Sequence, residues 1–218
     1  MLKLENVWYR YKKSSTDVLK ELDVCFEAGK LSSILGPSGS GKTTLLSIMA
    51  GLDRPTTGSI SIDGDDLSGM DLDKYRRERV SVIFQAFQLF PQLTALENVC
   101  YPMEAYGAAK KDAADQAKSL LESVGVTEDK FNRYPSNLSG GEQQRVAIAR
   151  ALSTGAKVIL ADEPTGNLDK ANGELVISIL KSLAHNHGYC VIVVTHNMDV
   201  AEASDVVYRM SDGAMRLV

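Results

Sequence analysis

The sequence has few cysteines, no excess of positive charge and no long apolar run. Its three cysteines, Cys25, Cys100 and Cys190, are widely spaced and include no Cys-x-x-Cys pair. We therefore expect reduced, buried thiols rather than a disulfide framework or a metal site. The net charge of −4 argues against nucleic acid as a partner, because a phosphate backbone attracts basic surfaces. No stretch reaches the roughly 18 apolar residues that cross a bilayer, and no targeting segment opens the chain. These absences predict a cytoplasmic protein.

The length and composition are those of a globular domain. With 218 residues, 44% of them hydrophobic and 24% charged, the chain can bury a sizeable core without disulfides or metals. One domain that carries an insertion is the first expectation. A local basic cluster, Arg76, Arg77 and Arg79, is interpreted as a solvated helix face.

Hydrophobic periodicity predicts an α/β fold. Apolar residues alternate along residues 2–7 and 22–26, which predicts two half-buried strands at the beginning of the chain. Further strands are expected at residues 31–35, 59–62, 80–84, 158–161 and 190–194, with a closing hairpin at 206–210 and 214–217. The uninterrupted apolar runs among them are typical of a parallel sheet covered on both faces.

Helical patterns occupy the intervening segments. Helices are predicted at residues 42–49, 72–79, 110–124 and 173–184. Strand-like runs are missing from residues 94–153, which indicates a helical insertion. We expect residues 1–90 and 156–218 to form the core with an N-terminal antiparallel β subdomain, and residues 91–155 to form a helical subdomain.

A glycine-rich loop lies between the strand at 31–35 and the helix at 42–49. Three glycines let backbone amides approach a triphosphate closely, and the helix adds its positive end. Lys42 is expected to reach the outer phosphates, and the Thr43 hydroxyl to ligate Mg²⁺. The loop consists of Gly36, Pro37, Ser38, Gly39, Ser40, Gly41, Lys42 and Thr43. The strand, loop and helix order predicts a P-loop NTPase (RecA-like) core.

Two carboxylates follow the buried strand at residues 158–161. Mg²⁺ prefers hard oxygen ligands, and a carboxylate at the end of a buried strand is held rigidly. Asp162 is predicted to bind the metal. Glu163, the next residue, is predicted to polarise the attacking water as general base. Taken alone, such a pair could equally face solvent.

Further motifs resemble those of the ATP-binding cassette (ABC) ATPases along essentially the whole chain. Gln85 is similar to the Q-loop glutamine of that family, His196 to its switch histidine, and Asn167–Asp169 to its D-loop. Leu138-Ser139-Gly140-Gly141-Glu142 matches the family's signature segment. Tyr11 resembles the aromatic residue that stacks on adenine, although Trp8 and Tyr9 compete for that role or for the core.

The resemblance implies the cofactors ATP and Mg²⁺ and a set of site residues. Glu163, His196, Gln85 and Lys42 are the implied catalytic residues, and Thr43, Gln85 and Asp162 the metal ligands. Tyr11, Thr44 and the glycine-rich loop would bind ATP. His185 and His187 lie outside any motif and are interpreted as structural.

The signature segment would serve a second nucleotide. Ser139, Gly140 and Gly141 precede a helix and so form another anion site of amides, a hydroxyl and a helix N-terminus. In the family, two cassettes pack head to tail, so each ATP lies between one P-loop and the partner's signature segment. This implies an ATP-dependent homodimer and weak hydrolysis by the monomer. The residues expected to contact the partner's ATP are Leu138, Ser139, Gly140, Gly141, Glu142 and Asp169.

The segments 89–99 and 162–169 look most like the bacterial ATPases for lipoprotein release, macrolide export and antimicrobial-peptide export. A separate transmembrane permease is then the implied partner, docked near Gln85 and residues 86–91, which would put the chain on the inner face of the cell membrane. Phe87, Leu89 and Phe90 could line that cleft or pack in the core. An ABC ATPase that drives signalling or cell-envelope regulation is the alternative. A small-molecule kinase is disfavoured because it should lack the signature segment, and a GTPase because Asn-Lys-x-Asp is absent.

Overall fold

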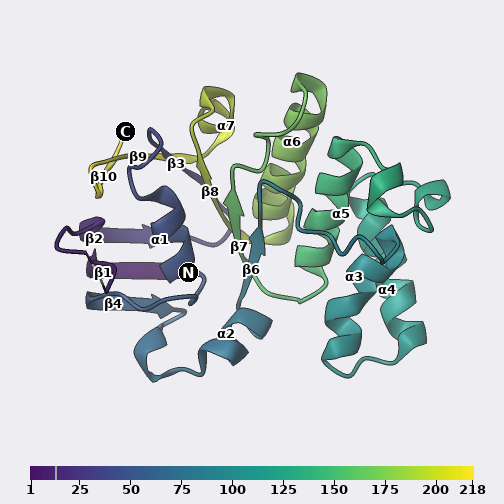
Figure 1. Ribbon diagram of the computed structural model, residues 1–218, viewed down its shortest axis with the longest axis horizontal. Coiled ribbons are helices and arrows are strands. Elements are labelled where there is room, and N and C mark those ends of the chain that lie inside the picture. Colours follow the sequence, from purple (N-terminus) through teal and green to yellow (C-terminus); the bar gives the residue numbers. More distant parts are fainter. Residues whose placement is uncertain (13) are drawn as a thin grey trace.

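The computed structural model describes residues 1–12 and 14–218, which form two sheets and a group of helices (Figure 1). In chain order the elements are β1 (Leu2–Tyr9), β2 (Leu19–Phe26), β3 (Leu31–Leu35), α1 (Lys42–Met49), β4 (Thr57–Ile62), β5 (Asp65–Asp66), η1 (Leu67–Gly69), α2 (Leu72–Glu78), β6 (Val80–Ile83), α3 (Ala95–Ala105), α4 (Lys110–Ser123), η2 (Glu128–Lys130), η3 (Pro135–Asn137), α5 (Gly140–Leu152), β7 (Val158–Asp162), α6 (Lys170–His187), β8 (Cys190–Thr195), α7 (Met198–Ala203), β9 (Val206–Ser211) and β10 (Ala214–Leu217).

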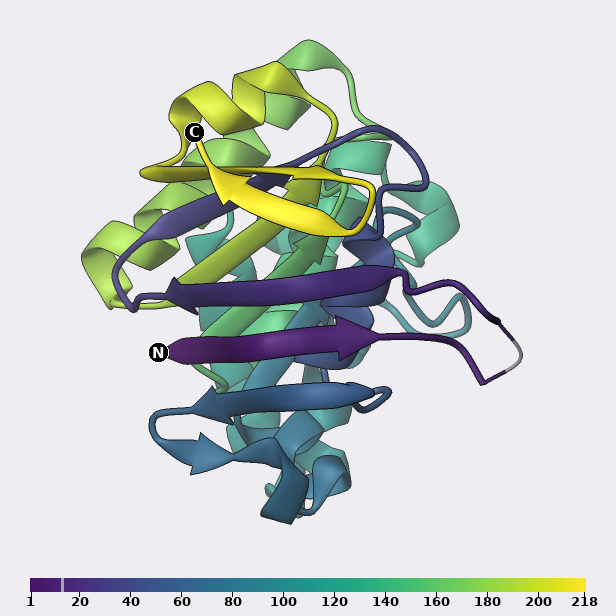
Figure 2. The ribbon, with the colours of Figure 1, turned by 90° about the vertical axis from the view of Figure 1, so that its left-hand side faces the viewer.

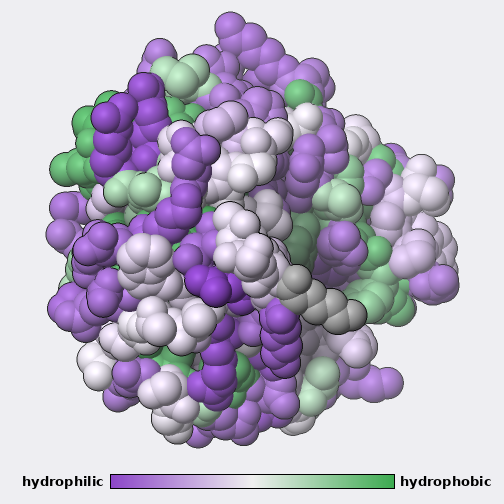
Figure 3. Space-filling model, turned by 60° about the vertical axis from the view of Figure 1, so that its left-hand side comes forward, coloured by the Kyte–Doolittle hydropathy of each residue, from purple (hydrophilic) through white to green (hydrophobic). Residues whose placement is uncertain are grey.

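The first sheet is antiparallel, with strand order β2-β1-β4-β5 (Figure 2). Along β1 the buried residues Leu4 and Val7 are three apart, which breaks the period of two. The cause is an irregularity: Asn6 has a φ of 48°, and the pairing register with β2 shifts between Leu4 and Val7. Such a bulge turns the next side chain back to the core face. The side of the molecule in Figure 3 is mostly hydrophilic or neutral, with small, scattered apolar areas. One face of this sheet therefore packs on the hydrophobic core.

The second sheet has six strands in the order β10-β9-β3-β8-β7-β6, and all pairs are parallel except β10 with β9. Every residue of β3 and β8 is buried, as expected for central strands covered on both faces. Helices α1 and α6 both contact these strands. The carboxyl ends of parallel strands meet at one edge, where ligands bind in such sheets. That edge brings together the ends of β3, β6, β7 and β8.

Helices α3, α4 and α5 pack on one another beside the sheets, at the right of Figure 1. Their contact faces include the fully buried Val99, Leu121 and Val146. Helix α3 begins with a capping box, in which Thr94 and Glu97 bond each other's backbone amides. The helical insertion expected from the sequence is present.

Helix α6 is longer than expected from the sequence. It begins at residue 170 rather than 173, because the Asp169 side chain caps it, and it ends at His187, followed by the C-cap Gly188 with a φ of 69°. Helix α7 was not expected, although its cap Asn197, which accepts from the Asp199 amide, is a recognisable start signal.

The interpretation of the arginine cluster as a solvated face was wrong. Arg76 donates to the Gly51 carbonyl and to Asp73, and Arg79 lies 3.2 Å from Asp63 and 3.5 Å from Asp65. The guanidinium of Arg77 stands 6.0 Å from the Tyr106 ring centroid. The cluster therefore joins α2 to neighbouring elements.

The cysteines are free thiols. Cys100 and Cys190 are buried as expected, and burial raises the pKa of the Cys190 thiol to about 11. Cys25 is only half-buried, contrary to expectation. Within the described parts of the chain, before and after residue 13, no helix has the length and apolar character needed to cross a membrane.

Candidate nucleotide site

The glycine-rich loop joins the end of β3 to the start of α1, as the sequence predicts. Gly41 has a φ of 104°, which an L side chain rarely adopts. At Gly36 a Cβ atom would overlap the Met210 carbonyl oxygen and lie 2.7 Å from Ser40 Oγ. Both positions therefore require glycine on backbone grounds.

The Lys42 side chain is buried under this loop. Its ammonium group donates to the Gly36 carbonyl at 2.7 Å and to the Pro37 carbonyl at 3.0 Å. The ammonium thus lies beneath the amides that a phosphate would meet. Ser40, also predicted in the loop, is buried, and among the described residues its hydroxyl has no hydrogen-bond partner.

A cavity of about 350 Å³ brings together most of the residues predicted for the chain's own nucleotide site. The P-loop and the first turn of α1 form one wall, and Gln85, Asp162 and Glu163 form the other. Its lining residues are Val18, Ser38, Gly39, Gly41, Lys42, Thr43, Thr44, Gln85, Asp162 and Glu163. Gly36, Pro37 and His196 line an adjoining cavity. The chain thus assembles one compact polar site at the carboxyl edge of the parallel sheet.

The electrostatics of this cavity suit a cation. Burial, together with the neighbouring Glu163, raises the pKa of the Asp162 carboxyl, and Lys42 acts in the opposite direction. A nearby cation would stabilise the ionised form of a buried carboxyl group that lies beside a second carboxylate. Among the described residues no cluster of three histidine, cysteine or acidic side chains forms a metal site. The donors here are a hydroxyl, an amide and a carboxylate, from Thr43, Gln85 and Asp162, and such hard oxygen donors fit Mg²⁺.

Glu163 is held by residues at the end of β8. One carboxylate oxygen accepts from Thr195 Oγ1 at 3.1 Å, and the other lies 2.8 Å from His196 Nδ1. The φ of Glu163 is 46°, a strained value that clusters at functional sites. Thr195 was not predicted from the sequence, since nothing but the fold places β8 beside β7.

The signature segment leads into α5. Ser139 is the N-cap, and its hydroxyl oxygen accepts from the Glu142 amide at 3.3 Å, which leaves the hydroxyl proton free to donate. Glu142 completes a capping box and lies 2.9 Å from Lys130. That hydrogen bond with Lys130 is the main cause that lowers the pKa of Glu142 to about 2.

None of the signature residues lines the cavity that contains Lys42 and Glu163. Figure 1 shows α1 and α5 on opposite sides of β7 and β8. Leu138, predicted to contact nucleotide, has its side chain in the hydrophobic core, with 6% exposed, so its side chain serves packing. The N-terminus of α5 therefore lies away from the cavity that contains Lys42 and Glu163.

The D-loop lies between these two regions. The Asn167 side-chain amide donates to the Gln85 backbone carbonyl at 2.9 Å. The Asp169 side chain caps α6 by accepting from the Asn172 backbone amide at 2.9 Å. Asn172 was not singled out from the sequence.

The three aromatic residues near the end of β1 differ in burial. Tyr9 is buried, and its hydroxyl donates to Asp53 at 2.5 Å. Tyr11 is 50% exposed, and its hydroxyl bonds to that of Thr44 beside the cavity. Tyr9 is thus core, while Tyr11 remains available to a ligand.

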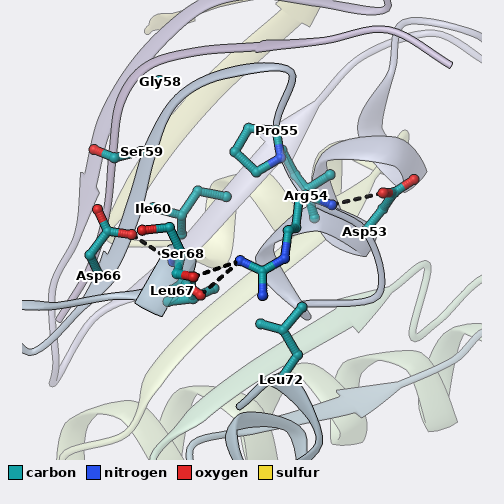
Figure 4. Close-up of a pocket in the computed structure, with 11 residues that line it drawn as sticks. Asp53, Arg54, Pro55, Gly58, Ser59, Ile60, Asp66, Leu67, Ser68 and Leu72 are labelled. Carbon is teal, nitrogen blue, oxygen red and sulfur yellow. Dashed lines mark hydrogen bonds between the residues drawn. The ribbon is translucent and has the colours of Figure 1, made fainter. Parts of the chain in front are cut away.

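A smaller crevice of about 130 Å³ lies at β4 and η1 (Figure 4). Arg54 points across it and donates to the carbonyls of Leu67 and Ser68, at 3.2 and 3.1 Å. Asp53 accepts from the Arg54 amide. The Arg54 guanidinium is thus bonded within this crevice and joins it to η1.

A larger groove of about 440 Å³ lies between the core and the helical subdomain. Its exposed apolar residues are Leu52, Phe90, Tyr101 and Tyr106. Of the three residues suggested for such a cleft, only Phe90 lines it. Leu89 packs on the helical core, and the Phe87 ring lies 3.7 Å from where a Gly140 Cβ would be.

Arg150, near the end of α5, forms part of the groove wall. Its guanidinium donates to the carbonyls of Gln88 at 2.6 Å and Phe87 at 3.1 Å. Phe87 and Gln88 have φ values of 57° and 53°. This bond pair holds a strained turn that the sequence did not reveal.

A strand, phosphate loop and helix beside a strand that ends in paired carboxylates define a P-loop NTPase. The family model described as ABC transporter matches residues 19–166. The chain belongs to this family, and it is an ABC-type ATPase.

Relatives cover nearly the whole chain. It is 41% identical over 214 residues to the uncharacterized ABC transporter ATP-binding protein YclH of Bacillus subtilis, covering 98% of this chain and 95% of the relative. It is 48% identical to the macrolide export ATP-binding/permease protein MacB of Agrobacterium fabrum, covering 91% of this chain and 31% of MacB.

Solved structures agree with the fold. MJ0796, an ABC transporter cassette of Methanocaldococcus jannaschii, has a dimeric structure with a TM-score of 0.89 and 39% identity, covering 100% of this chain and 98% of the other. A second dimeric structure of MJ0796 is a post-hydrolysis state bound to ADP and Pi, with the same TM-score.

Proposed function

We propose that this chain is the ATP-hydrolysing subunit of a membrane complex, in which two copies close around two ATP molecules and drive a separate permease. One observation carries the proposal. The cavity with Lys42 and Glu163 contains no residue of the signature segment, although that segment offers a capped helix N-terminus with a free hydroxyl proton at Ser139. A second copy related by two-fold symmetry would supply the missing part to each site.

Within one chain, different residues bind the nucleotide, hold the metal and activate the attacking water. The loop amides, Lys42 and Thr44 bind the phosphates, and Tyr11 stacks on the adenine. Mg²⁺, held by Thr43, Gln85 and Asp162, would neutralise phosphate charge. Glu163 orients and deprotonates the attacking water, while His196 contacts the terminal phosphate. The 2.8 Å separation of His196 and Glu163 supports this pairing.

The second copy contributes Ser139, Gly140, Gly141 and Asp169 to the same nucleotide. Helix N-termini attract anions through their free amides and dipole. ATP then joins the two copies, and loss of the terminal phosphate removes the contacts that hold them together. The dimeric MJ0796 cassettes support this arrangement.

The groove at Phe90 and Tyr101 is the proposed docking site of the permease. Its exposed apolar side chains lie together between the core and the helical subdomain, and apolar residues gathered at a concave surface favour a partner helix. Docking there would hold the chain at the cytoplasmic face of the membrane. The similarity to MacB, named for macrolide export, favours export or release of a hydrophobic drug, a lipoprotein or a peptide.

The test is the mass of the Glu163→Gln chain with and without ATP and Mg²⁺. Without its base the chain cannot hydrolyse ATP, so a dimer should accumulate. Glu174→Gln, an exposed glutamate on α6, is the matched control and should remain monomeric under turnover. A Glu163→Gln chain that stays monomeric at saturating ATP would contradict the shared site.

A further inference from the structure

Asn172 lies where the signature segment meets the D-loop. It is the third residue of α6, and its side chain is partly buried. Its Nδ2 donates to Asp169 Oδ2 at 2.7 Å, and its backbone amide donates to Asp169 Oδ1 at 2.9 Å. Two bonds to one carboxylate fix the orientation of Asp169.

The same side chain bonds to the signature helix. Asn172 Oδ1 accepts from Arg145 Nη1 at 3.2 Å. Arg145 is only 8% exposed, and within the described residues Asn172 is the one side chain that accepts from its guanidinium. A buried guanidinium destabilises the folded chain when its hydrogen-bond acceptors are removed, because its charge is then left unpaired. One amide thus connects α6 to α5.

Asn172 also occupies the space that a side chain at Gly141 would need. A Cβ atom at Gly141 would lie 2.9 Å from the Asn172 Cβ and would overlap its amide oxygen. Gly141 is therefore required by this contact within the chain, apart from any contact with nucleotide. The absent side chain lets the signature segment rest directly on Asn172.

We infer that Asn172 is a positioning residue that locks the signature segment to the D-loop, so that both reach the partner's ATP as one unit. The inference rests on the proposed shared site. Two segments that contact the same ligand lose less conformational entropy on binding when they are already fixed relative to each other. Asn172 itself touches no nucleotide in this arrangement.

The first test compares ATP-driven dimers. In the Glu163→Gln background, Asn172→Ala should raise the protein concentration at which half the chains are dimeric by about tenfold or more, as expected for lost side-chain hydrogen bonds. ATP binding to the monomer, measured with a fluorescent ATP analogue, should not change. Asn186→Ala is the matched control, since Asn186 lies on the same helix and, among the described residues, its side chain bonds to Ser182 alone.

Asn172→Asp is a second variant that keeps the test valid if Asn172→Ala fails to fold. The aspartate keeps an acceptor for Arg145 but cannot donate to Asp169, and two adjacent carboxylates repel. We expect a folded chain with normal ATP binding and weakened dimerisation. Dimerisation of either variant equal to that of the Glu163→Gln parent would overturn the inference.

A mixing experiment identifies the site that is affected. Adding inactive Glu163→Gln chains to Asn172→Ala chains should raise hydrolysis, because a mixed dimer contains one site with an intact base and an intact signature segment. Adding Glu163→Gln/Asn172→Ala double variants should not. No rise with either partner would mean that Asn172 acts in its own chain's site. If Glu163→Gln alone never dimerises, the shared site itself fails, which is a separate outcome.

Discussion

His196 Nδ1 and Glu163 Oε1 lie 2.8 Å apart, so the proposed general base and the side chain proposed to contact the terminal phosphate touch each other directly. The second carboxylate oxygen of Glu163 is held by Thr195. Residues at the end of β8 therefore fix the direction of a carboxylate that follows the neighbouring strand β7.

Thr195→Val tests how much that orientation matters. Thr195 is completely buried, and valine has nearly its shape but no hydroxyl to bond Glu163. We expect kcat for ATP hydrolysis to fall about tenfold while KM stays similar, since general-base catalysis depends on position. Thr154→Val, which removes a hydroxyl bonded to Ser81 far from the site, is the control for lost stability. Equal effects on kcat from both variants would contradict the positioning role.

Ser139→Arg should abolish hydrolysis and leave ATP binding to the monomer nearly intact. The long cation blocks the partner's phosphate site, and loss of the N-cap costs only about 1 kcal/mol. Equilibrium binding and steady-state hydrolysis, measured on the same preparation, separate the two effects. Ser178→Arg, at an exposed position of α6, should change neither. If Ser139→Arg also lost binding, the signature segment would serve its own chain's nucleotide.

Glu142 makes folding stability depend on pH. Its pKa is lowered to about 2 in the folded chain, chiefly by the hydrogen bond with Lys130. A lowered carboxyl pKa adds stability above the unfolded value near 4.5 and loses it as the pH falls towards 2. Glu142→Gln should therefore cost about 1 kcal/mol at pH 7, after allowance for solvent screening.

Urea denaturation of the Glu142→Gln variant and its parent at several pH values measures this difference. The gap in unfolding free energy should narrow as the pH drops below 4.5. Glu122→Gln, at an exposed site on α4, is the control and should match the parent throughout. A gap that stays constant down to pH 3 would exclude the ion pair as its cause.

Phe90→Ser tests the docking groove. Phe90 is 41% exposed and lines the groove near Tyr101. Removing the ring should weaken association with the permease severalfold, as for a central aromatic contact, while hydrolysis by the free chain stays close to normal. Tyr134→Ser, which removes an aromatic ring that is 47% exposed outside the groove, is the comparison. Equal retention of both variants on the permease would place the partner elsewhere.

The contiguous parts of the site could be predicted from the sequence. The P-loop and the pair Asp162 and Glu163 each follow a buried strand, so local pattern determines both structure and chemistry. Parallel strand order then brings Gln85 and His196 to the same edge. Tyr11 lies beside Thr44, and its stacking on adenine stays a prediction.

The remaining contacts depend on tertiary packing. Thr195, Asn172 and Arg150 bond residues far away in the sequence, and no local period marks such partners. The arginines of α2 were misinterpreted for the same reason, because their acceptors lie on other elements. Leu138 differs in another way, since this position of the signature segment has its side chain in the hydrophobic core, and its contact with the partner's nucleotide stays a prediction.

Helix α5 connects two places that are distant on the surface. Ser139 caps its beginning, and Arg150 near its end holds the turn at Phe87 and Gln88 in the groove wall. Eleven residues of α-helix span about 17 Å. A closely packed helix has low compressibility, so its length stays nearly constant. Movement of the groove wall by a docked partner would therefore be carried along α5 to Ser139, at the end proposed to face the partner copy's phosphates.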